Sequence, residues 1–295
     1  MVVLLFLFLA FLPPRFQSTT IKANIKGQEI EINTKALSTT PEKAAAEFDA
    51  RTDYVDSSRG FAFKRPSNSR WSDPKILHGL VELLAEKKVA TSGPLKQAFE
   101  QTGESFDPVA EMVRRADIVR ITGGKKVHLE ITPSTNTELL ALMIERILRI
   151  SQQQQVNLDK DAVSKSIRES MGIDSADINN ELNVYVLSKK DAKEFEGRLT
   201  MASLFVRLAP LLAAVKIDKP AADERSILSG LSETLTNVKV DGAPGDLRID
   251  RWFFITEGPG AFYMIEIAYS PQTNESADTW TDLSHMMTSF RVFQR

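Results

Sequence analysis

The sequence predicts an α+β fold. Segments with a two-residue hydrophobic period, such as 21–32 and 248–269, contain turn residues and indicate antiparallel hairpins. Segments with the period of an amphipathic helix, above all 139–148, concentrate in the middle of the chain. The pattern therefore indicates antiparallel strands together with a largely helical insertion or second lobe.

The N-terminus predicts export. Val2 to Leu12 is an unbroken apolar run closed by Pro13. A membrane span needs about 20 such residues, whereas the core of a signal peptide needs about 7–15. We therefore expect a signal-like leader over 1–20, cleavage near Ser18 and a periplasmic or secreted protein, which an uncleaved leader would tether to the membrane. No basic residue precedes the run and no Ala-x-Ala site follows it, so a buried N-terminal strand or helix is the alternative.

The first folded segment covers 21–73. Alternation over 21–32 around Lys26-Gly27-Gln28 predicts a short hairpin. Thr40 and Pro41 are a typical helix start and predict a helix over 39–50. A strand follows in which Phe61 and Phe63 share one face, and Trp71 ends the segment as an aromatic plug.

Residues 74–180 are predicted to be mostly helical. Apolar side chains recur at helical spacing in three stretches, which are 76–84, 109–113 and 139–148. One strand pair interrupts them: Asp117–Thr122 and Lys126–Thr132 are expected to be joined by a tight turn at Gly123-Gly124-Lys125.

Residues 181–295 are predicted to form a C-terminal α+β unit. The expected elements, in order, are a strand at 182–187, helices at 201–215 and 222–236, a hairpin of Arg248–Thr256 with Ala261–Tyr269, a helix at Glu275–Met287 and a strand at 288–293. Trp280, Leu283 and Met287 are spaced i, i+3 and i+7, so they should face the sheet.

Composition excludes several classes of function. The chain has 295 residues, 42% of them hydrophobic, which is enough for one large domain or two. The formal net charge is −2, and the basic residues are scattered in pairs such as Lys87-Lys88 and Lys125-Lys126, so a nucleic-acid partner is not expected. Without cysteine the chain has no disulfide, no thiolate nucleophile and no lipid-modified cysteine.

No motif indicates a metal or a cofactor. The histidines His78, His128 and His285 are far apart in sequence and have no metal-ligand spacing. The stretch 157–168 opens with the spacing of a calcium loop, but it has Ala162 where glycine is needed and ends in arginine. Gly123 to Lys126 lacks the first glycine and the final hydroxyl of a phosphate-binding loop. We expect neither cofactor nor metal.

Two stretches resemble one family. The opening stretch, with Tyr54-Val55-Asp56, Gly60-Phe61, Pro66 and Trp71, and the strand, strand, helix and strand order of 222–295 are similar to PsbP-like proteins, which include the photosystem II extrinsic subunit and its bacterial relatives. The long block between them has no counterpart in that family. The resemblance implies an antiparallel sheet with helices on both faces, an α/β/α sandwich, in which Phe290 and Val292 add a strand to the hairpin's sheet. It also implies a binding or assembly factor without catalytic residues.

Two functions remain open. The first is an exported, non-enzymatic protein that recognises a protein partner through a sheet edge or an aromatic cleft, with Trp71, Trp252 and Tyr263 as candidate anchors; the alternative for these three is a place in the core. The second is a hydrolase-like enzyme whose site is assembled from distant residues such as His128, Asp282 and His285. The sequence does not indicate the oligomeric state.

Overall fold

The structure is a computed structural model that describes residues 20–25, 28–33, 48–67, 70–91, 115–132, 134–137, 159, 161, 173–192, 227–273 and 278–293. Within these ranges the protein is mainly β. The predicted α+β sandwich with a largely helical lobe is therefore wrong, because strands make up most of the described structure. Long strands occupy positions where the sequence pattern indicates a helix or a turn.

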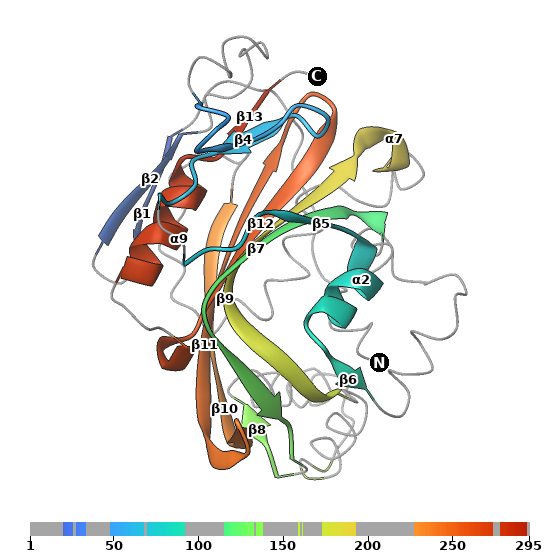
Figure 1. The fold of residues 1–295 in the computed structure, drawn as a ribbon, viewed down its shortest axis with the longest axis vertical. Coiled ribbons are helices and arrows are strands. Elements are labelled where there is room, and N and C mark those ends of the chain that lie inside the picture. Colours follow the sequence, from blue (N-terminus) through green and yellow to red (C-terminus); the bar gives the residue numbers. More distant parts are fainter. Residues whose placement is uncertain are drawn as a thin grey trace.

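Antiparallel pairing builds one large sheet (Figure 1). Its strands, in spatial order, are β5 (Lys75–His78), β7 (Asp117–Glu130), β10 (Ile227–Val240), β11 (Ala243–Glu257), β12 (Ala261–Tyr269), β9 (Ile173–Ser188) and β6 (Ala90–Thr91), with β8 (Asn136–Thr137) beside β10. β7 pairs with β9 along most of its length and with the end of β10 through Lys239 and Val240. The ladder therefore returns to β7 after passing through β9, β12, β11 and β10.

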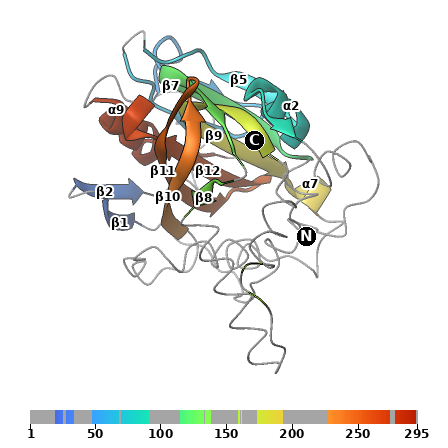
Figure 2. The same cartoon turned by 90° about the horizontal axis from the view of Figure 1, so that it is seen from below.

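The two faces of the large sheet carry different elements (Figure 2). On one side lie α9 (Asp278–Thr288) and a small sheet of β13 (Arg291–Val292), β4 (Phe61–Phe63) and β3 (Tyr54–Asp56). The hairpin of β1 (Thr20–Ile25) and β2 (Gln28–Asn33) lies beside α9. On the other side lies α2 (Gly79–Glu86). The short helices α7 (Lys189–Ala192) and η4 (Pro271–Thr273) follow β9 and β12.

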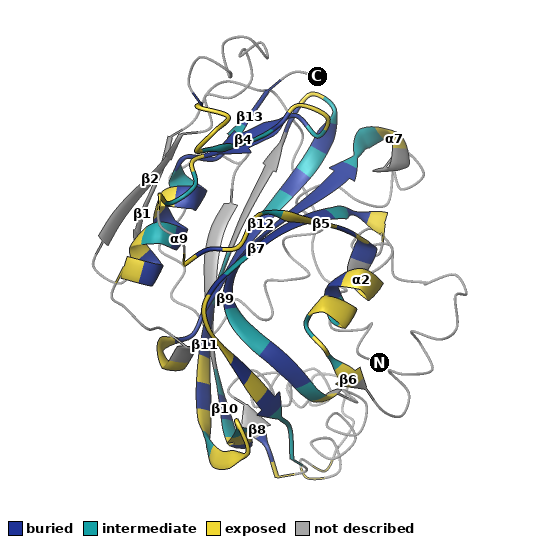
Figure 3. Cartoon of the chain, in the orientation of Figure 1, coloured by how far each residue is buried: buried dark blue, intermediate teal, exposed yellow. Residues whose placement is uncertain are grey.

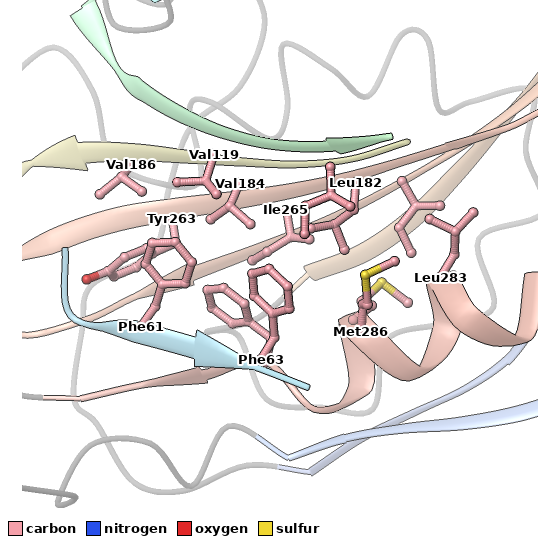
Figure 4. Close-up of a cluster of buried hydrophobic side chains, with 14 of the residues drawn as sticks. Phe61, Phe63, Val119, Leu182, Val184, Val186, Tyr263, Ile265, Leu283 and Met286 are labelled. Atoms are coloured by element: carbon pink, nitrogen blue, oxygen red, sulfur yellow. The ribbon is translucent and has the colours of Figure 1, made fainter. Parts of the chain in front are cut away.

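The main core lies between the large sheet and the layer of α9 and β4. Figure 4 shows side chains of β4 and α9 pointing toward those of β7, β9 and β12. Phe61 stacks on Phe63 with ring centroids 6.2 Å apart and on Phe290 at 5.4 Å, and Tyr263 meets Phe61 edge-on at 5.9 Å. Apolar burial of this kind contributes about 25 cal/mol for each Å² removed from water. In Figure 3 the strands of this region are largely buried, whereas much of α2 is exposed.

The helix predicted at 222–236 is wrong, because β10 occupies 227–240. Leucine and alanine in this stretch favour a helix locally, but β10 pairs with β11 over almost its whole length. Asp241 and Gly242 join the two strands, with φ values of 50° and 84°. Positive φ at both positions is the requirement of a tight type I′ hairpin turn, and Asp-Gly is a sequence that provides it.

The hairpin predicted within 117–132 is also wrong, because β7 runs on through 117–130 as one strand. Both halves of β7 pair with β9, and the register shifts between Gly123 and Val127. The glycines therefore form a bulge and not a reversal. Trp71 bridges to Gly123, and a Cβ atom built on Gly123 would lie 2.5 Å from the Trp71 ring, so this glycine permits the close approach of the indole.

The C-terminal unit agrees with the sequence except at its last strand. The β11–β12 hairpin, the α9 helix and the inward positions of Trp280, Leu283 and Met287 are confirmed. The prediction that Phe290 and Val292 extend the hairpin's sheet is wrong, because β13 pairs with β4 of the small sheet. Both edges of β12 are already taken, by β11 and by β9. This difference removes the terminal strand as support for the PsbP-like resemblance.

Other predictions are confirmed or fall on residues that are not described. The hairpin predicted within 21–32 is confirmed as β1 and β2, and the strand at 182–187 as part of β9. The leader, most of the helix at 39–50 and the helices at 109–113, 139–148 and 201–215 lie outside the described residues. Among the helices that the structure does describe, none is long and apolar enough to cross a membrane.

Candidate functional site

Buried charged residues gather on the α2 face of the large sheet. Side chains alternate along a strand, so Leu182, Val184 and Val186 of β9 enter the main core while the odd-numbered residues between them face α2. The residues that meet there come from the end of α2, β7, β9, β11 and β12, and we call them the ion cluster: Lys87, Arg120, Glu181, Asn183, Tyr185, Arg251 and Glu266.

Glu181 is the centre of the ion cluster and is buried. Arg120 donates to its Oε2 atom from Nε at 2.9 Å and from Nη2 at 2.6 Å. Its Oε1 atom accepts from Lys87 Nζ and, at 3.2 Å, from Asn183 Nδ2. Both oxygens of the carboxylate are therefore occupied by charged or amide donors, which is what a buried carboxylate requires.

Glu266 on β12 is paired in the same way. Its Oε2 atom accepts from the Tyr185 hydroxyl at 2.7 Å and from Asn183 Nδ2 at 3.2 Å, and its Oε1 atom accepts from Arg251 Nη1 at 2.7 Å. Asn183 thus bridges the two carboxylates through its amide nitrogen. Glu181 and Glu266 share a bridging donor, and the cations Lys87, Arg120 and Arg251 keep the pair ionised.

The pKa values of the ion cluster move away from neutrality. Burial raises the pKa of Glu181, but the charges of Lys87 and Arg120 outweigh it and hold the pKa at about 2. Burial also raises the pKa of Glu266, but the charges of Arg251 and Lys87 outweigh burial and lower that pKa. Burial and the Glu266 charge raise the pKa of Tyr185 well above its ordinary value. None of these three groups is set to exchange a proton near pH 7, where a general acid or base works best.

The end of α2 positions Lys87. The helix packs on the sheet through Leu83, which lies in a small cluster with Ile118 and Tyr185. Lys87 is its C-cap, and the Lys87 carbonyl accepts from the backbone N–H of Asp177 on β9 at 2.7 Å. This backbone bond ties the helix end to β9, so the Lys87 ammonium group is held above Glu181.

A second charged group surrounds Asp177, whose side chain is buried. Lys126 Nζ lies 2.6 Å from its Oδ2 atom, His128 Nδ1 lies 3.0 Å from its Oδ1 atom, and Lys88 Nζ is 3.9 Å away. The sheet thus brings together at Asp177 one lysine from each of two pairs, Lys88 and Lys126, that look like unrelated solvated surface in the sequence. The charges of Lys126 and Lys88 offset that of Asp177, although its buried Oδ2 atom has no hydrogen-bond partner among the described residues. These contacts add to the attachment of α2 to β9 and β7.

The β5 end of the large sheet, where the described residues provide no further strand, carries the third notable group. β5 ends the sheet, and α2 follows it directly in the chain. Ile76 on β5 is 41% exposed and Val81 on α2 is 57% exposed, and these are the large hydrophobic side chains that the described surface exposes. Between them, His78 Nδ1 lies 2.9 Å from Asp117 Oδ1. We call this region, residues 75–86 with Asp117, the β5–α2 edge.

Two of the three candidate aromatic anchors lie in the core. Trp71 is 7% exposed and donates from Nε1 to Asp282 at 2.8 Å, and Tyr263 is 1% exposed and donates from its hydroxyl to the Arg59 carbonyl at 2.6 Å. Trp252 is half-buried and packs 6.2 Å from the Trp280 ring. Trp71 and Tyr263 therefore stabilise the fold and do not offer a surface to a partner.

The residues of the hydrolase hypothesis do not form one site. His128 on β7 bonds to Asp177 through its ring and to Asp241 through its backbone. Asp282 on α9 accepts instead from Trp71 and Arg70. Of the stretch 157–168, which opens with the spacing of a calcium loop but is not expected to bind metal, the structure describes Asp159 and Asp161. No group of three potential ligands within the described ranges could hold a metal ion.

Sequence reasoning missed the ion cluster. Its signal was the alternation of polar and apolar residues in 181–186, which indicates a strand with one polar face and says nothing of that face being buried. Comparison of the chain with models of known protein families, with curated proteins and with solved structures finds no match. Function must therefore be argued from the geometry of these groups.

Proposed function

We propose that this chain is a non-enzymatic protein that binds another protein. The observation that carries the proposal is the pairing of both carboxylates of the ion cluster, Glu181 and Glu266. Its two carboxylates have partners at all four oxygens, and their pKa values and that of Tyr185 are shifted away from neutrality. A catalytic carboxylate needs a free oxygen and a pKa near the working pH, so the ion cluster fits a structural role.

The β5–α2 edge is the surface that best fits a partner. A terminal strand presents unpaired backbone groups that an extended segment of another protein can complete. Exposed apolar side chains at Ile76 and Val81, bordered by the Lys75 and Glu86 ion pair, give this edge the apolar centre and polar rim of an interface. We therefore place partner recognition here and not at the aromatic residues of the core.

Site-specific photocrosslinking in the native host tests the proposal. A photoreactive residue at Val81 should give one discrete crosslinked product, and the same residue at Lys239, which is exposed on β10, should not. The product should disappear in an Ile76→Asp background whose melting temperature is unchanged. Absence of a discrete product from positions 76, 78 and 81, or the same product from position 239, would contradict the proposal.

We further propose that the protein is exported. The support is the apolar run at 2–12, whose length suits the core of a signal peptide and not a membrane span. Intact-mass measurement of the protein from its native host should show a chain that starts near Ser18. A full-length chain that begins at Met1 and is recovered from the soluble cytosolic fraction would refute export.

A further inference from the structure

The backbone register decides which groups of β5 face outward. The Gly79 N–H donates to the Ala116 carbonyl at 2.9 Å, and Gly79 continues the pairing in which Leu77 lies opposite Ile118 and Lys75 opposite Arg120. In an antiparallel pair, residues that exchange hydrogen bonds alternate with residues that do not. Lys75 and Leu77 therefore bond to β7, and the backbone groups of Ile76 and His78 point away from the sheet.

The outward edge of β5 offers few backbone hydrogen-bond donors. The His78 N–H donates to Glu82 Oε2 at 2.7 Å, so it is already used. Pro74, just before the strand, has no N–H at all. Among the described residues the Ile76 N–H has no acceptor and remains as a donor, beside the carbonyl acceptors of Ile76 and His78.

The His78 ring adds another acceptor. Its Nδ1 atom faces Asp117 Oδ1, and the Asp117 carboxylate is held by Arg59, whose Nε and Nη2 atoms lie 2.9 Å and 2.7 Å from Oδ2. An ionised carboxylate can only accept, so Nδ1 carries the proton of the neutral ring and Nε2 presents its lone pair. The His78 side chain is 67% exposed.

The charges around His78 are mostly negative. Arg59 is bound between Asp56 and Asp117, and Arg115, two residues before Asp117 in the chain, is a second cation of this region. Glu82 adds a third carboxylate at the backbone of His78. On the α2 side, Lys75 and Glu86 neutralise each other. An edge rich in acceptors and in negative charge complements a segment rich in donors and in positive charge.

We propose that the β5–α2 edge binds an extended, cationic segment of the partner protein and that His78 Nε2 accepts a hydrogen bond from a lysine or arginine of that segment. The inference rests on the proposed function and specifies its ligand. Ile76 and His78 lie two residues apart on one face of β5, so an apolar residue two positions from the cation, on the same face of the added strand, would pack on Ile76.

Two capped peptides provide the probe, one with lysine and valine at successive positions of the same strand face and one with glutamate in place of that lysine. Titration of the labelled protein, followed by NMR, should shift the amides of Ile76, His78 and Val81 saturably with the lysine peptide and leave them unmoved with the glutamate peptide. His78→Phe should weaken the lysine peptide about tenfold, the cost of losing one charge-assisted hydrogen bond. His285→Phe, an exposed histidine on α9, is the matched control and should bind like wild type.

Equal binding of the two peptides, no binding of the lysine peptide at millimolar concentration, or an unchanged affinity in His78→Phe would overturn the inference. Long-range nitrogen NMR gives an independent readout, because neutral His78 should carry its proton on Nδ1, and a proton on Nε2 would overturn it as well. A crosslink from position 81 together with failure of the peptide would leave the proposed function standing and refute only the cationic ligand. Absence of the crosslink would refute the proposed function itself.

Discussion

The two faces of β9 are both buried over 181–187 but are stabilised in opposite ways. One face of β9 sends Leu182, Val184 and Val186 into an aromatic and aliphatic core, and the other sends Glu181 and Asn183 into the ion cluster. The apolar face gains free energy from every side chain it removes from water. The charged face loses hydration free energy, and only well-placed hydrogen bonds and ion pairs offset that loss. Its contribution to stability therefore depends on geometry. Residues that are neighbours in the strand thus follow different energetic rules.

The largest effect is expected on the apolar face. Phe290 is buried against the rings of Phe61 and Tyr263, so Phe290→Ala should lower the free energy of unfolding by about 3–5 kcal/mol. Chemical denaturation at neutral pH measures it. Val81→Ala on the exposed side of α2 is the control and should cost under about 0.5 kcal/mol. A loss below about 1 kcal/mol for Phe290→Ala would mean that the ring is not part of the core.

The charged face should respond to pH. The pKa of Glu181 is lowered in the folded protein to about 2, so its contribution is complete above the unfolded pKa of about 4.3 and is lost as the pH falls toward 2. Glu181→Gln should be destabilised by about 3 kcal/mol at pH 7, because it leaves Lys87 and Arg120 without their counter-charge. The difference from wild type should shrink between about pH 4.5 and pH 2.

Denaturation curves at several pH values across that window measure the difference. Glu130→Gln removes an exposed carboxylate that pairs with Lys239, and because water screens such pairs it should follow the wild-type curve closely. A difference between Glu181→Gln and wild type that stays constant down to pH 2 would show that the Glu181 charge does not stabilise the fold.

The smallest of these effects concerns Gly123, which lies against the Trp71 ring. A methyl group there would contact the ring at 2.5 Å, whereas one on Gly245 would meet nothing within 4 Å. Gly123→Ala should therefore cost about 1–3 kcal/mol through overpacking, and Gly245→Ala should change stability by less than about 0.5 kcal/mol. Thermal unfolding of the two variants compares them directly. Equal melting temperatures would contradict the tight packing of Trp71 on β7.

Local signals predicted those parts of the fold whose partners lie nearby in sequence. The β11–β12 hairpin surrounds the turn at Gly258, and α9 shows its inward face through the spacing of Trp280 and Leu283. The Asp241-Gly242 turn was an equally local signal, and it identifies β10 as a strand once it is given more weight than helix propensity. β13 could not be predicted, because its pairing with β4 depends on which sheet edges are already occupied.

The candidate site was less predictable than the fold. Lys87, Arg120, Glu181 and Glu266 belong to four segments far apart in the chain, and each alone is typical of a solvated surface. The register of β7, β9 and β12 brings them together, and that register is a property of the whole sheet. His78 likewise gains its partner only because β5 pairs with the start of β7, opposite Asp117.

A double-mutant cycle on Arg120 and Glu181 tests most directly the claim that the ion cluster is a paired structural element. Arg120→Met, Glu181→Leu and the double variant are compared with wild type by chemical denaturation. Arg120→Met leaves Glu181 with Lys87 as its one cation, and Glu181→Leu takes the bidentate counter-charge from Arg120. The double variant should therefore be more stable than the sum of the two losses predicts, with a coupling energy of about 2 kcal/mol. A coupling energy below about 0.5 kcal/mol would contradict the claim and reopen the cluster as a catalytic or ligand site.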